Sequence, residues 1–208
     1  MKIRILFIEP PLSSSSGVKF LNHQIPLGFL FMAGILEKNG FEVKILDCPL
    51  YYKLKKPVEE GVVKFGLFSE QIKEEIKKFK PQIIGVSCSF TMFEADSFDV
   101  IDIIKETDKN AKIVVGGAHV SANPEFVLRN KKIDLAVIGE GELTILEIAK
   151  RIRDKKKLDN LPGTALIFNN KFKRNSSQKQ IENLDDLEPA WHLIKFEDYF
   201  SHPDNSAV

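Results

Sequence analysis

Short apolar runs alternate with segments of helical periodicity along most of the chain. The runs carry β-branched and large apolar residues, whereas the segments between them place apolar residues three and four positions apart. Strands that are apolar throughout are typical of a parallel sheet with both faces buried. The predicted strands are 3–8, 41–47, 81–89, 111–117 and 133–142, the last with its exit loop, and the predicted helices are 27–38, 69–80, 94–107, 124–128 and 143–153.

Five strands that alternate with helices predict a doubly wound α/β fold. We expect a parallel five-stranded sheet of the flavodoxin-like type, with the strand order 2-1-3-4-5 and helices on both faces. In such sheets, ligands bind outside the carboxyl ends of the strands, beside the point where the strand order reverses. The loops after the first, third, fourth and fifth strands are therefore the candidate binding loops.

The pattern weakens in two stretches of the sequence. Residues 48–66 are polar and irregular, which predicts a long connection between a strand and the following helix. Residues 163–175 favour a β-hairpin with Asn169 and Asn170 in its turn. The segment that follows the hairpin shows little periodicity.

Composition and charge narrow the classes of function. The chain has 30 basic and 29 acidic residues and a formal net charge of +1, which disfavours nucleic-acid binding because such domains usually carry a basic excess. No apolar run reaches the roughly 18 residues of a membrane-spanning helix, and the N-terminal run is too short for a signal peptide. Cys48 and Cys88 are far apart and are expected to be reduced, as in a cytoplasmic protein without a membrane partner.

The loop after the first strand, residues 10–17, combines two prolines with four serines and a glycine. The prolines end the strand abruptly, and the small residues would let a ligand approach and offer hydroxyl groups to it. A flexible surface loop explains the same composition equally well.

The loop after the third strand places Ser87, Ser89 and Thr91 at the mouth of the sheet. Their hydroxyl groups can bind a ligand, but a hydroxyl at this point can also cap the next helix. Capping explains Thr91 well, whereas Ser87 and Ser89 lie deeper in the strand.

Glycines interrupt the chain after the fourth and fifth strands. Gly116 and Gly117 permit a positive φ angle or a close approach to the backbone, by a packed helix or by a flat ligand. Gly139 and Gly141 flank a turn before a helix. Glu142 has a sufficient explanation in the helix dipole, which favours an acidic residue at this end.

Motifs for metal, nucleotide or nucleophilic chemistry are absent from the sequence. His23 and His119 stand alone in loops, where a histidine is usually structural or solvated, and no paired metal-ligand spacing accompanies them. The P-loop and the glycine-rich dinucleotide fingerprint are missing. Two cysteines are also too few to hold an iron–sulfur cluster.

Three segments, PLGFLFMAGILEKNGFEVKILD (26–47), VVGGAHVSANPE (114–125) and DLAVIGEGELTILEI (134–148), resemble the N-terminal cobalamin-binding domain of the B12-dependent radical SAM family. The match covers about residues 1–155. Residues 156–208 would then be the hairpin and the linker toward a radical SAM barrel. The cysteine motif of that barrel is not in the chain, so the resemblance implies a domain of a longer enzyme, whose [4Fe-4S] cluster and S-adenosylmethionine belong to an absent C-terminal part.

The resemblance also implies a site for the corinoid. Its nucleotide tail would pass between sheet and helices, with the glycines of the fourth strand clearing space and the serines of the third strand bonding polar atoms. The loop of residues 10–17 would lie against the corrin face or against the tail. The candidate cofactor-binding residues are Pro11, Leu12, Ser13, Ser87, Ser89, Thr91, Gly116, Gly117, Ala118, His119, Val120, Ser121, Gly139, Glu140, Gly141 and Glu142.

One departure concerns the lower axial ligand of cobalt. The methionine-synthase type of B12 domain carries D-x-H-x-x-G after the first strand, and this chain has EPPLSS there. We therefore expect cobalamin to bind base-off without a protein histidine, its lower face open, bound to water or covered by Leu12. No residue of the chain is expected to be catalytic or to bind a metal.

The resemblance implies a cobalamin-binding module of an enzyme for methyl transfer or related radical chemistry. Its partners would be the corinoid and the enzyme's own radical SAM barrel, and the module alone would not be a catalyst. One alternative is a degenerate flavodoxin-like interaction or substrate-positioning domain that binds no cobalamin. Another is a flavin or nucleotide binder at the same sheet edge.

Overall fold

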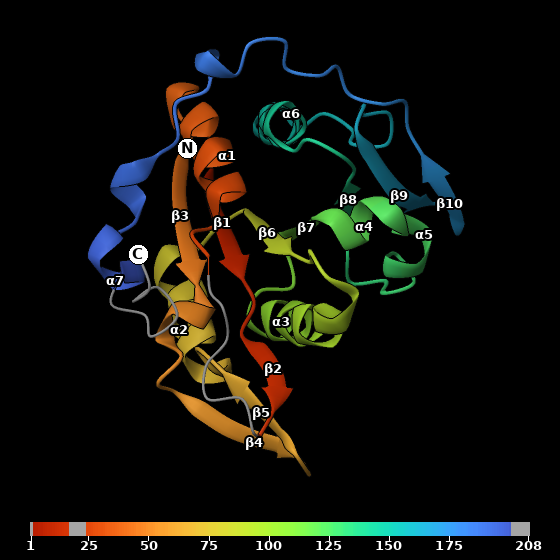
Figure 1. The fold of residues 1–208 in the computed structure, drawn as a ribbon. Coiled ribbons are helices and arrows are strands. Elements are labelled where there is room, and N and C mark those ends of the chain that lie inside the picture. The colour runs from red at the N-terminus through yellow and green to blue at the C-terminus, as the bar shows by residue number, and fades with distance from the viewer. Residues whose placement is uncertain (1, 17–23, 201–208) are drawn as a thin grey trace.

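The computed structural model describes residues 2–16 and 24–200, which are built around a seven-stranded sheet (Figure 1). Its strands in spatial order are β10 (Lys171–Arg174), β9 (Thr164–Phe168), β8 (Leu135–Val137), β7 (Lys112–Gly116), β6 (Ile83–Ser87), β1 (Arg4–Glu9) and β3 (Glu42–Asp47). The five strands from β3 to β8 are parallel, and their order confirms the predicted 2-1-3-4-5 arrangement.

The prediction of five strands is wrong, because the two strands of the C-terminal hairpin join the same sheet. β9 pairs antiparallel with β8, and β10 pairs antiparallel with β9. The turn is as predicted: Asn169 and Asn170 have φ angles of 49° and 60°, which the type I′ turn of a two-residue hairpin requires. The hairpin supplies partners for the edge of β8, which would otherwise present unpaired backbone groups.

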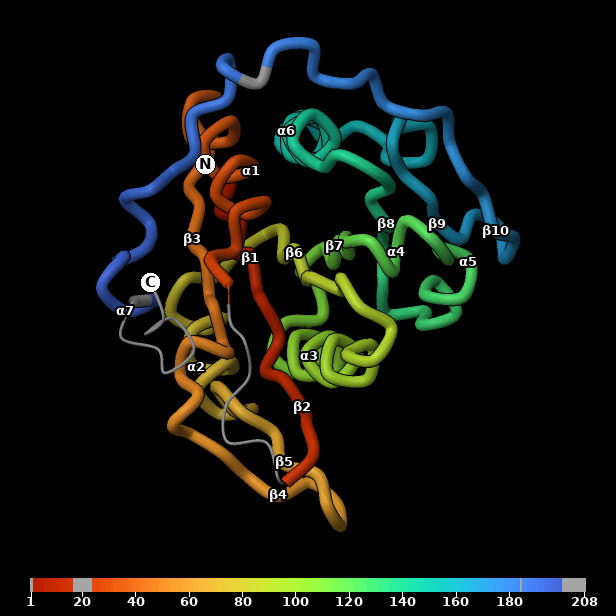
Figure 2. The backbone as a smooth tube through the Cα atoms, in the orientation of Figure 1, coloured from red at the N-terminus to blue at the C-terminus, as the bar shows by residue number. Residues whose placement is uncertain are grey.

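Helices cover both faces of the sheet (Figure 2). One face packs against α1 (Leu27–Lys38) and α6 (Glu142–Arg153), and the other packs against α2 (Ser69–Phe79) and α3 (Glu94–Thr107). Successive strand residues point to opposite faces. The two apolar clusters therefore draw on alternate positions of the strands, such as Phe7 for the α1–α6 side and Ile8 for the α2–α3 side.

A second, antiparallel sheet lies beyond the end of β1, where the sequence predicts only loops. Its order is β2 (Leu12–Ser15), β5 (Val62–Phe65) and β4 (Lys55–Glu59). Thus the loop after the first strand and the irregular connection 48–66 pair with each other, and both predictions are wrong at these residues. Every residue of β4 is exposed, so no alternation of apolar and polar side chains marks it in the sequence.

The remaining elements are short. α4 (Ala118–Ala122) and α5 (Pro124–Val127) follow β7, and α4 is a helix that the sequence analysis does not predict. Single 3₁₀ turns are Cys48–Tyr51, Thr91–Phe93, Leu184–Asp186 and Trp191–Leu193, and α7 (Phe196–Phe200) is the last element. Within residues 2–16 and 24–200, no helix combines the length and the apolar character that crossing a bilayer requires.

Candidate functional site

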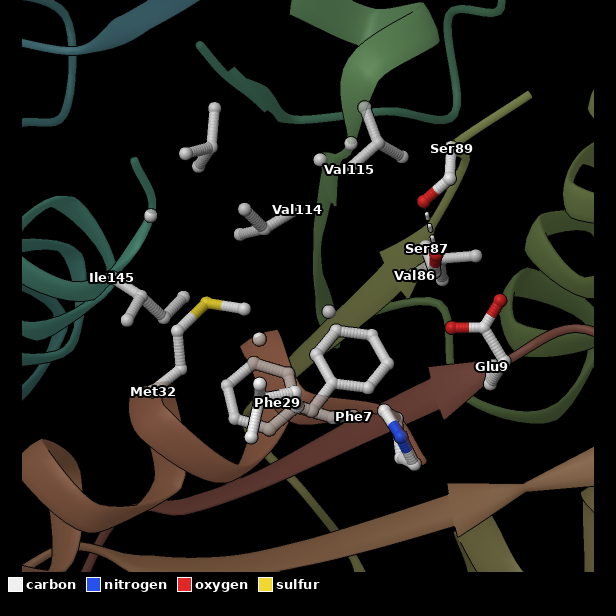
Figure 3. A pocket seen from close by; sticks show the side chains of 18 of the residues that line it. Phe7, Glu9, Phe29, Met32, Val86, Ser87, Ser89, Val114, Val115 and Ile145 are labelled. Atoms are coloured by element: carbon white, nitrogen blue, oxygen red, sulfur yellow. Dashed lines mark hydrogen bonds between the residues drawn. The ribbon is translucent and has the colours of Figure 1, made fainter. Parts of the chain in front are cut away.

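A pocket of about 580 Å³ opens at the carboxyl ends of β1, β6, β7 and β8, on the face that α1 and α6 cover (Figure 3). Residues of these four strands form its floor, and side chains at alternate positions point toward the same face. Its other walls come from the first two turns of α1, the first turn of α6 and the adjoining loops. The residues of these strands are Phe7, Glu9, Gly85, Val86, Ser87, Val114, Val115, Gly116 and Val137. The helix residues are Leu27, Gly28, Phe29, Met32, Glu142 and Ile145.

The inner end of the pocket is apolar and aromatic. The rings of Phe7 and Phe29 stack with centroids 4.8 Å apart and planes 12° from parallel. Gly85 makes this possible, because a Cβ atom there would lie 2.6 Å from Cδ1 of Phe7. A glycine in the middle of the third predicted strand is thus explained by the ring that lies over its backbone.

The two glycines at the end of β7 differ in what surrounds them. Gly117 has a φ angle of 125°, and a Cβ atom there would lie 2.7 Å from the carbonyl oxygen of Cys88, so the local backbone alone requires glycine. At Gly116, a Cβ atom would meet only the Cβ of Val137 at 3.8 Å. A side chain at Gly116 would therefore enter the pocket without straining the backbone.

Oxygen atoms gather at the mouth of the pocket. The hydroxyl oxygens of Ser87 and Ser89 lie 3.2 Å apart. Glu142 begins α6, and its Oε2 is buried without a hydrogen-bond partner among the residues that the structure describes. A buried oxygen of this kind is costly unless a donor reaches it, so the mouth suits a ligand that carries N–H groups.

The structure brings most of the predicted site residues together and places the others outside the pocket. Those that line it are Leu12, Ser87, Ser89, Gly116, Gly117, Gly139, Glu140, Gly141 and Glu142. Those that do not are Pro11, Ser13, Thr91, Ala118, His119, Val120 and Ser121. The second group falls largely in α4 and in β2, the two elements that the sequence analysis takes for loops.

His119 is buried behind the pocket and bonds two polar side chains that are more exposed than its own. Its Nε2 is 2.5 Å from Oε2 of Glu94, and its Nδ1 is 2.9 Å from the hydroxyl oxygen of Thr91. Thr91 therefore bonds a histidine rather than capping the next helix. These bonds tie α4 to the loop after β6, which carries Ser89 and Phe90 to the pocket.

Several other predicted residues serve the fold. Ser13 donates its N–H and its hydroxyl to the carboxylate of Asp96 at 2.8 and 2.7 Å. Val120 belongs to the core. The hydroxyl oxygen of Ser121 accepts the N–H of Gly139 at 3.0 Å, so it supports a pocket residue from behind. Pro11 is buried, and Ala118 is exposed at the start of α4.

The pocket's apolar residues are the ones that sequence reasoning missed. Phe29, Met32 and Ile145 have the periodicity of ordinary helix core positions, so nothing in the pattern separates them from the core. The signal that could have found them was Gly85, since a glycine inside a strand often marks a place where another group lies close to the backbone. Phe7 is its neighbour across the strand pair.

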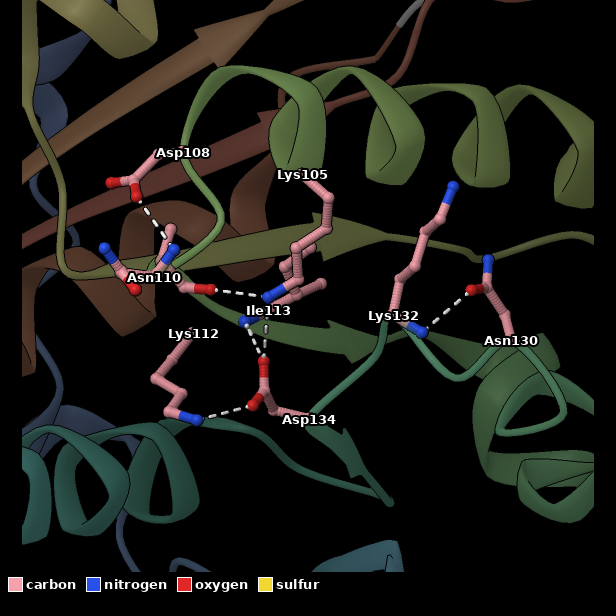
Figure 4. Close-up of polar contacts among 9 residues, drawn as sticks. Lys105, Asp108, Asn110, Lys112, Ile113, Asn130, Lys132 and Asp134 are labelled. Atoms are coloured by element: carbon pink, nitrogen blue, oxygen red, sulfur yellow. Dashed lines mark hydrogen bonds and ion pairs between the residues drawn. The ribbon is translucent and has the colours of Figure 1, made fainter.

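A polar cluster at the amino ends of β7 and β8 (Figure 4) includes none of the residues that line the pocket. Asp134 accepts the N–H of Ile113 at 2.9 Å and pairs with Lys112 at 2.7 Å. Lys105 of α3 donates to the carbonyl oxygen of Ala111 at 2.9 Å. These contacts stabilise the amino ends of the two strands, whereas the pocket lies at their carboxyl ends.

Neither a histidine nor a metal-binding cluster appears at the pocket in the described part of the chain. His23, a loop residue noted in the sequence, lies outside the described residues. Cys48 and Cys88 are free and buried, and burial raises the pKa of both thiols.

Known proteins share this architecture. A TsrM radical S-adenosylmethionine methyltransferase from Kitasatospora setae, solved with cobalamin and a [4Fe-4S] cluster bound, superposes with a TM-score of 0.67 at 21% identity. The match covers 91% of this chain and 31% of that one. At this identity the similarity establishes the fold.

Sequence comparison gives the family. An uncharacterized methyltransferase of Pyrococcus horikoshii is 30% identical over 202 residues, which are 96% of this chain and 40% of the relative. A cytidylyl-2-hydroxyethylphosphonate methyltransferase of Streptomyces wedmorensis is 31% identical over 144 residues, 67% of this chain and 27% of that enzyme. The chain thus spans less than half the length of these relatives. The model of the B12 binding domain matches residues 17–149, more than half of the chain, which therefore belongs to the B12-binding domain family and resembles the corresponding part of cobalamin-dependent radical SAM enzymes.

Proposed function

We propose that the chain binds cobalamin with its nucleotide tail in the pocket beneath α1 and α6, as the corinoid-holding module of a B12-dependent radical SAM enzyme. The observation that carries this proposal is the position of the pocket. It lies at the carboxyl ends of β1 and β6, where the strand order reverses, in a member of the B12-binding family.

The residues that line the pocket fit the chemistry of a corinoid tail. The stacked rings of Phe7 and Phe29 offer a flat apolar surface to an aromatic base, and Gly116 leaves the floor open beside them. The volume of about 580 Å³ lies within the usual range of ligand pockets. At the mouth, the unpaired Oε2 of Glu142 can accept an N–H from one of the amide side chains of the corrin ring.

The lower face of the corrin would meet β2. Leu12 lines the pocket and is held in place by the pairing of β2 with β5. With apolar Leu12 there and no histidine among the described lining residues, we propose base-off binding without a protein ligand to cobalt.

When bound, the corinoid supplies a cobalt centre that can carry a methyl group or take part in radical chemistry. This chain's residues would orient the cofactor and keep water from its tail. The relatives named as methyltransferases support methyl transfer or related radical chemistry in the full-length protein. We propose that its [4Fe-4S] cluster and S-adenosylmethionine belong to a part outside these 208 residues.

The primary test is titration of the chain with hydroxocobalamin, followed by desalting and an absorption spectrum. We expect retained pigment in close to equal amount with the protein and a base-off spectrum. A spectrum with nitrogen bound to the lower face would contradict the proposed role of Leu12. If neither this chain nor the full-length protein retains pigment, the degenerate-module alternative replaces the proposal.

A substitution at Gly116 tests where the tail lies. Gly116→Leu would fill the pocket floor, so we expect hydroxocobalamin affinity to fall roughly tenfold or more, since overpacking costs about 1–3 kcal/mol. The matched control is Ala122→Leu on the exposed side of α4, which should bind as the unsubstituted chain does. Thermal unfolding of both variants verifies that they are folded, and unchanged affinity in a folded Gly116→Leu variant would place the tail elsewhere.

A further inference from the structure

The segment from Glu188 to Tyr199, here called the strap, returns from the hairpin to the opposite edge of the sheet. After β10 the chain arches past α6 and α1 and reaches α7 beside β3 (Figure 1). Ala190 and Tyr199 of the strap are buried, and Ala190 belongs to the same apolar cluster as Phe7 and Phe29 of the pocket. Ala190 therefore joins the strap to the core on the pocket side of the sheet.

The first anchor of the strap is the outer face of α1. The N–H of Ala190 donates to the carbonyl oxygen of Leu30 at 3.0 Å. One turn further on, Gly34 leaves room for the strap backbone, because a Cβ atom there would lie 1.8 Å from the carbonyl oxygen of Glu188. His192 adds a contact at 3.1 Å between its Nε2 and the carboxylate of Glu37.

These contacts lie on one stripe of α1, and the pocket lies on another. Leu30, Gly34 and Glu37 follow each other at helical spacing and face the strap. Phe29 and Met32 line the pocket. The helix thus lies between the strap and the ligand site and contacts both.

The second anchor is the end of β3. The hydroxyl of Tyr199 donates to Oδ2 of Asp47 at 2.6 Å, and both residues are buried. Pro49, two residues after Asp47, lines the pocket. The strap therefore ends on a second element that contributes to the pocket wall.

We propose that the strap is a clamp, and that Gly34 and Tyr199 are positioning residues that hold α1 and the exit of β3 where they close the corinoid pocket. The inference rests on the proposed function. Because coupling between two sites is reciprocal, a bound corinoid must also stabilise the strap. Residues that anchor the strap, although they lie outside the pocket, would then influence the affinity for the corinoid.

The experiment compares two strap variants with two matched controls in hydroxocobalamin titrations. Gly34→Ala displaces the strap from α1, and Tyr199→Phe removes its bond to Asp47. We expect the dissociation constant to rise by about fivefold or more in each, the lower end of couplings between sites. Two controls have exposed side chains, Lys38→Ala on the same helix and Tyr51→Phe at the end of the turn after β3. Both should stay within about twofold of the unsubstituted chain, because neither side chain bonds to a strap anchor among the described residues.

Hydrogen exchange of residues 188–199 provides the independent readout. Hydroxocobalamin should slow exchange in the strap of the unsubstituted chain, and the two strap variants should exchange faster before ligand is added. Variants with faster strap exchange and unchanged affinity would overturn the clamp while leaving the proposed function intact. If the unsubstituted chain binds no hydroxocobalamin, the same variants are compared in the full-length protein, and if that protein binds none either, the proposed function fails and the clamp fails with it. Circular dichroism checks folding, and if Gly34→Ala does not fold, Tyr199→Phe decides.

Discussion

Asp96 in the first turn of α3 shows how one buried residue positions a binding loop. Its side chain is 3% exposed, and its carboxylate accepts two bonds from Ser13 and pairs with Lys64 at 3.0 Å. Ser13 belongs to β2 and Lys64 to β5, so a single carboxylate fastens the small sheet to α3. Leu12, the pocket residue of β2, is thereby fixed by its neighbour.

We predict that Asp96→Asn destabilises the protein by about 3 kcal/mol, because it removes one partner of a buried ion pair. The matched control is Asp99→Asn. Asp99 bonds the same lysine at 2.6 Å, but its side chain is 64% exposed, and exposed pairs contribute about 0–1 kcal/mol. Urea unfolding of both variants measures the difference. Equal, small effects would mean that Asp96 does not hold the small sheet in place.

Among the elements, the loop after β6 depends on His119. We predict that His119→Ala lowers the free energy of unfolding by about 1–3 kcal/mol, since it leaves Glu94 and Thr91 without their buried partner. Exchange of residues 89–93 should become faster. The absorption spectrum of bound hydroxocobalamin should stay the same, because His119 does not line the pocket. A changed spectrum would instead indicate that His119 approaches the cobalt.

The elements that the sequence predicted are those with a buried face. The five parallel strands and the four long helices have apolar positions at a regular spacing. The hairpin turn could be predicted because Asn169 and Asn170 tolerate the positive φ angles that it requires. β2 and β4 escape prediction because serines and an exposed, proline-containing strand pair through backbone bonds without burying a face. α4 is missed because five residues are too few for a periodic pattern.

For the molecule as a whole, the sequence predicted which edge of the sheet holds the pocket. It did not predict the residues that form the inner end of the pocket. Loops that follow parallel strands must meet at one edge, so Ser87, Gly116 and Glu142 could be grouped in advance. The aromatic inner end could not, because Phe7 and Phe29 look like any core residues until the register of the strands is known. The strap was expected to be a linker, since its contacts with Leu30 and Gly34 of α1 use backbone atoms that leave no pattern in the sequence.

The small sheet and the strap, on two sides of the pocket, each depend on a group whose pKa is raised on folding. Burial, together with the charge of Asp47 and the hydrogen bond to it, raises the pKa of Tyr199. For Lys64, burial lowers the pKa, but the hydrogen bonds to Asp99 and Asp96 outweigh this effect and raise it. A group of this kind stabilises the fold fully below its unfolded pKa, and the contribution is lost as pH rises through the folded value.

We therefore predict that the free energy of unfolding falls as pH rises above about 10, where free tyrosine and lysine begin to lose their protons. In this window the unfolded chain binds fewer protons than the folded one, so each group contributes a decline of up to about 1.4 kcal/mol per pH unit. Urea unfolding between pH 8 and 11 measures the slope. Tyr199→Phe has no proton to lose and should show a shallower decline, whereas Tyr51→Phe should keep the slope of the unsubstituted chain. Equal slopes in all three proteins would mean that the bond between Tyr199 and Asp47 does not distinguish the folded from the unfolded chain.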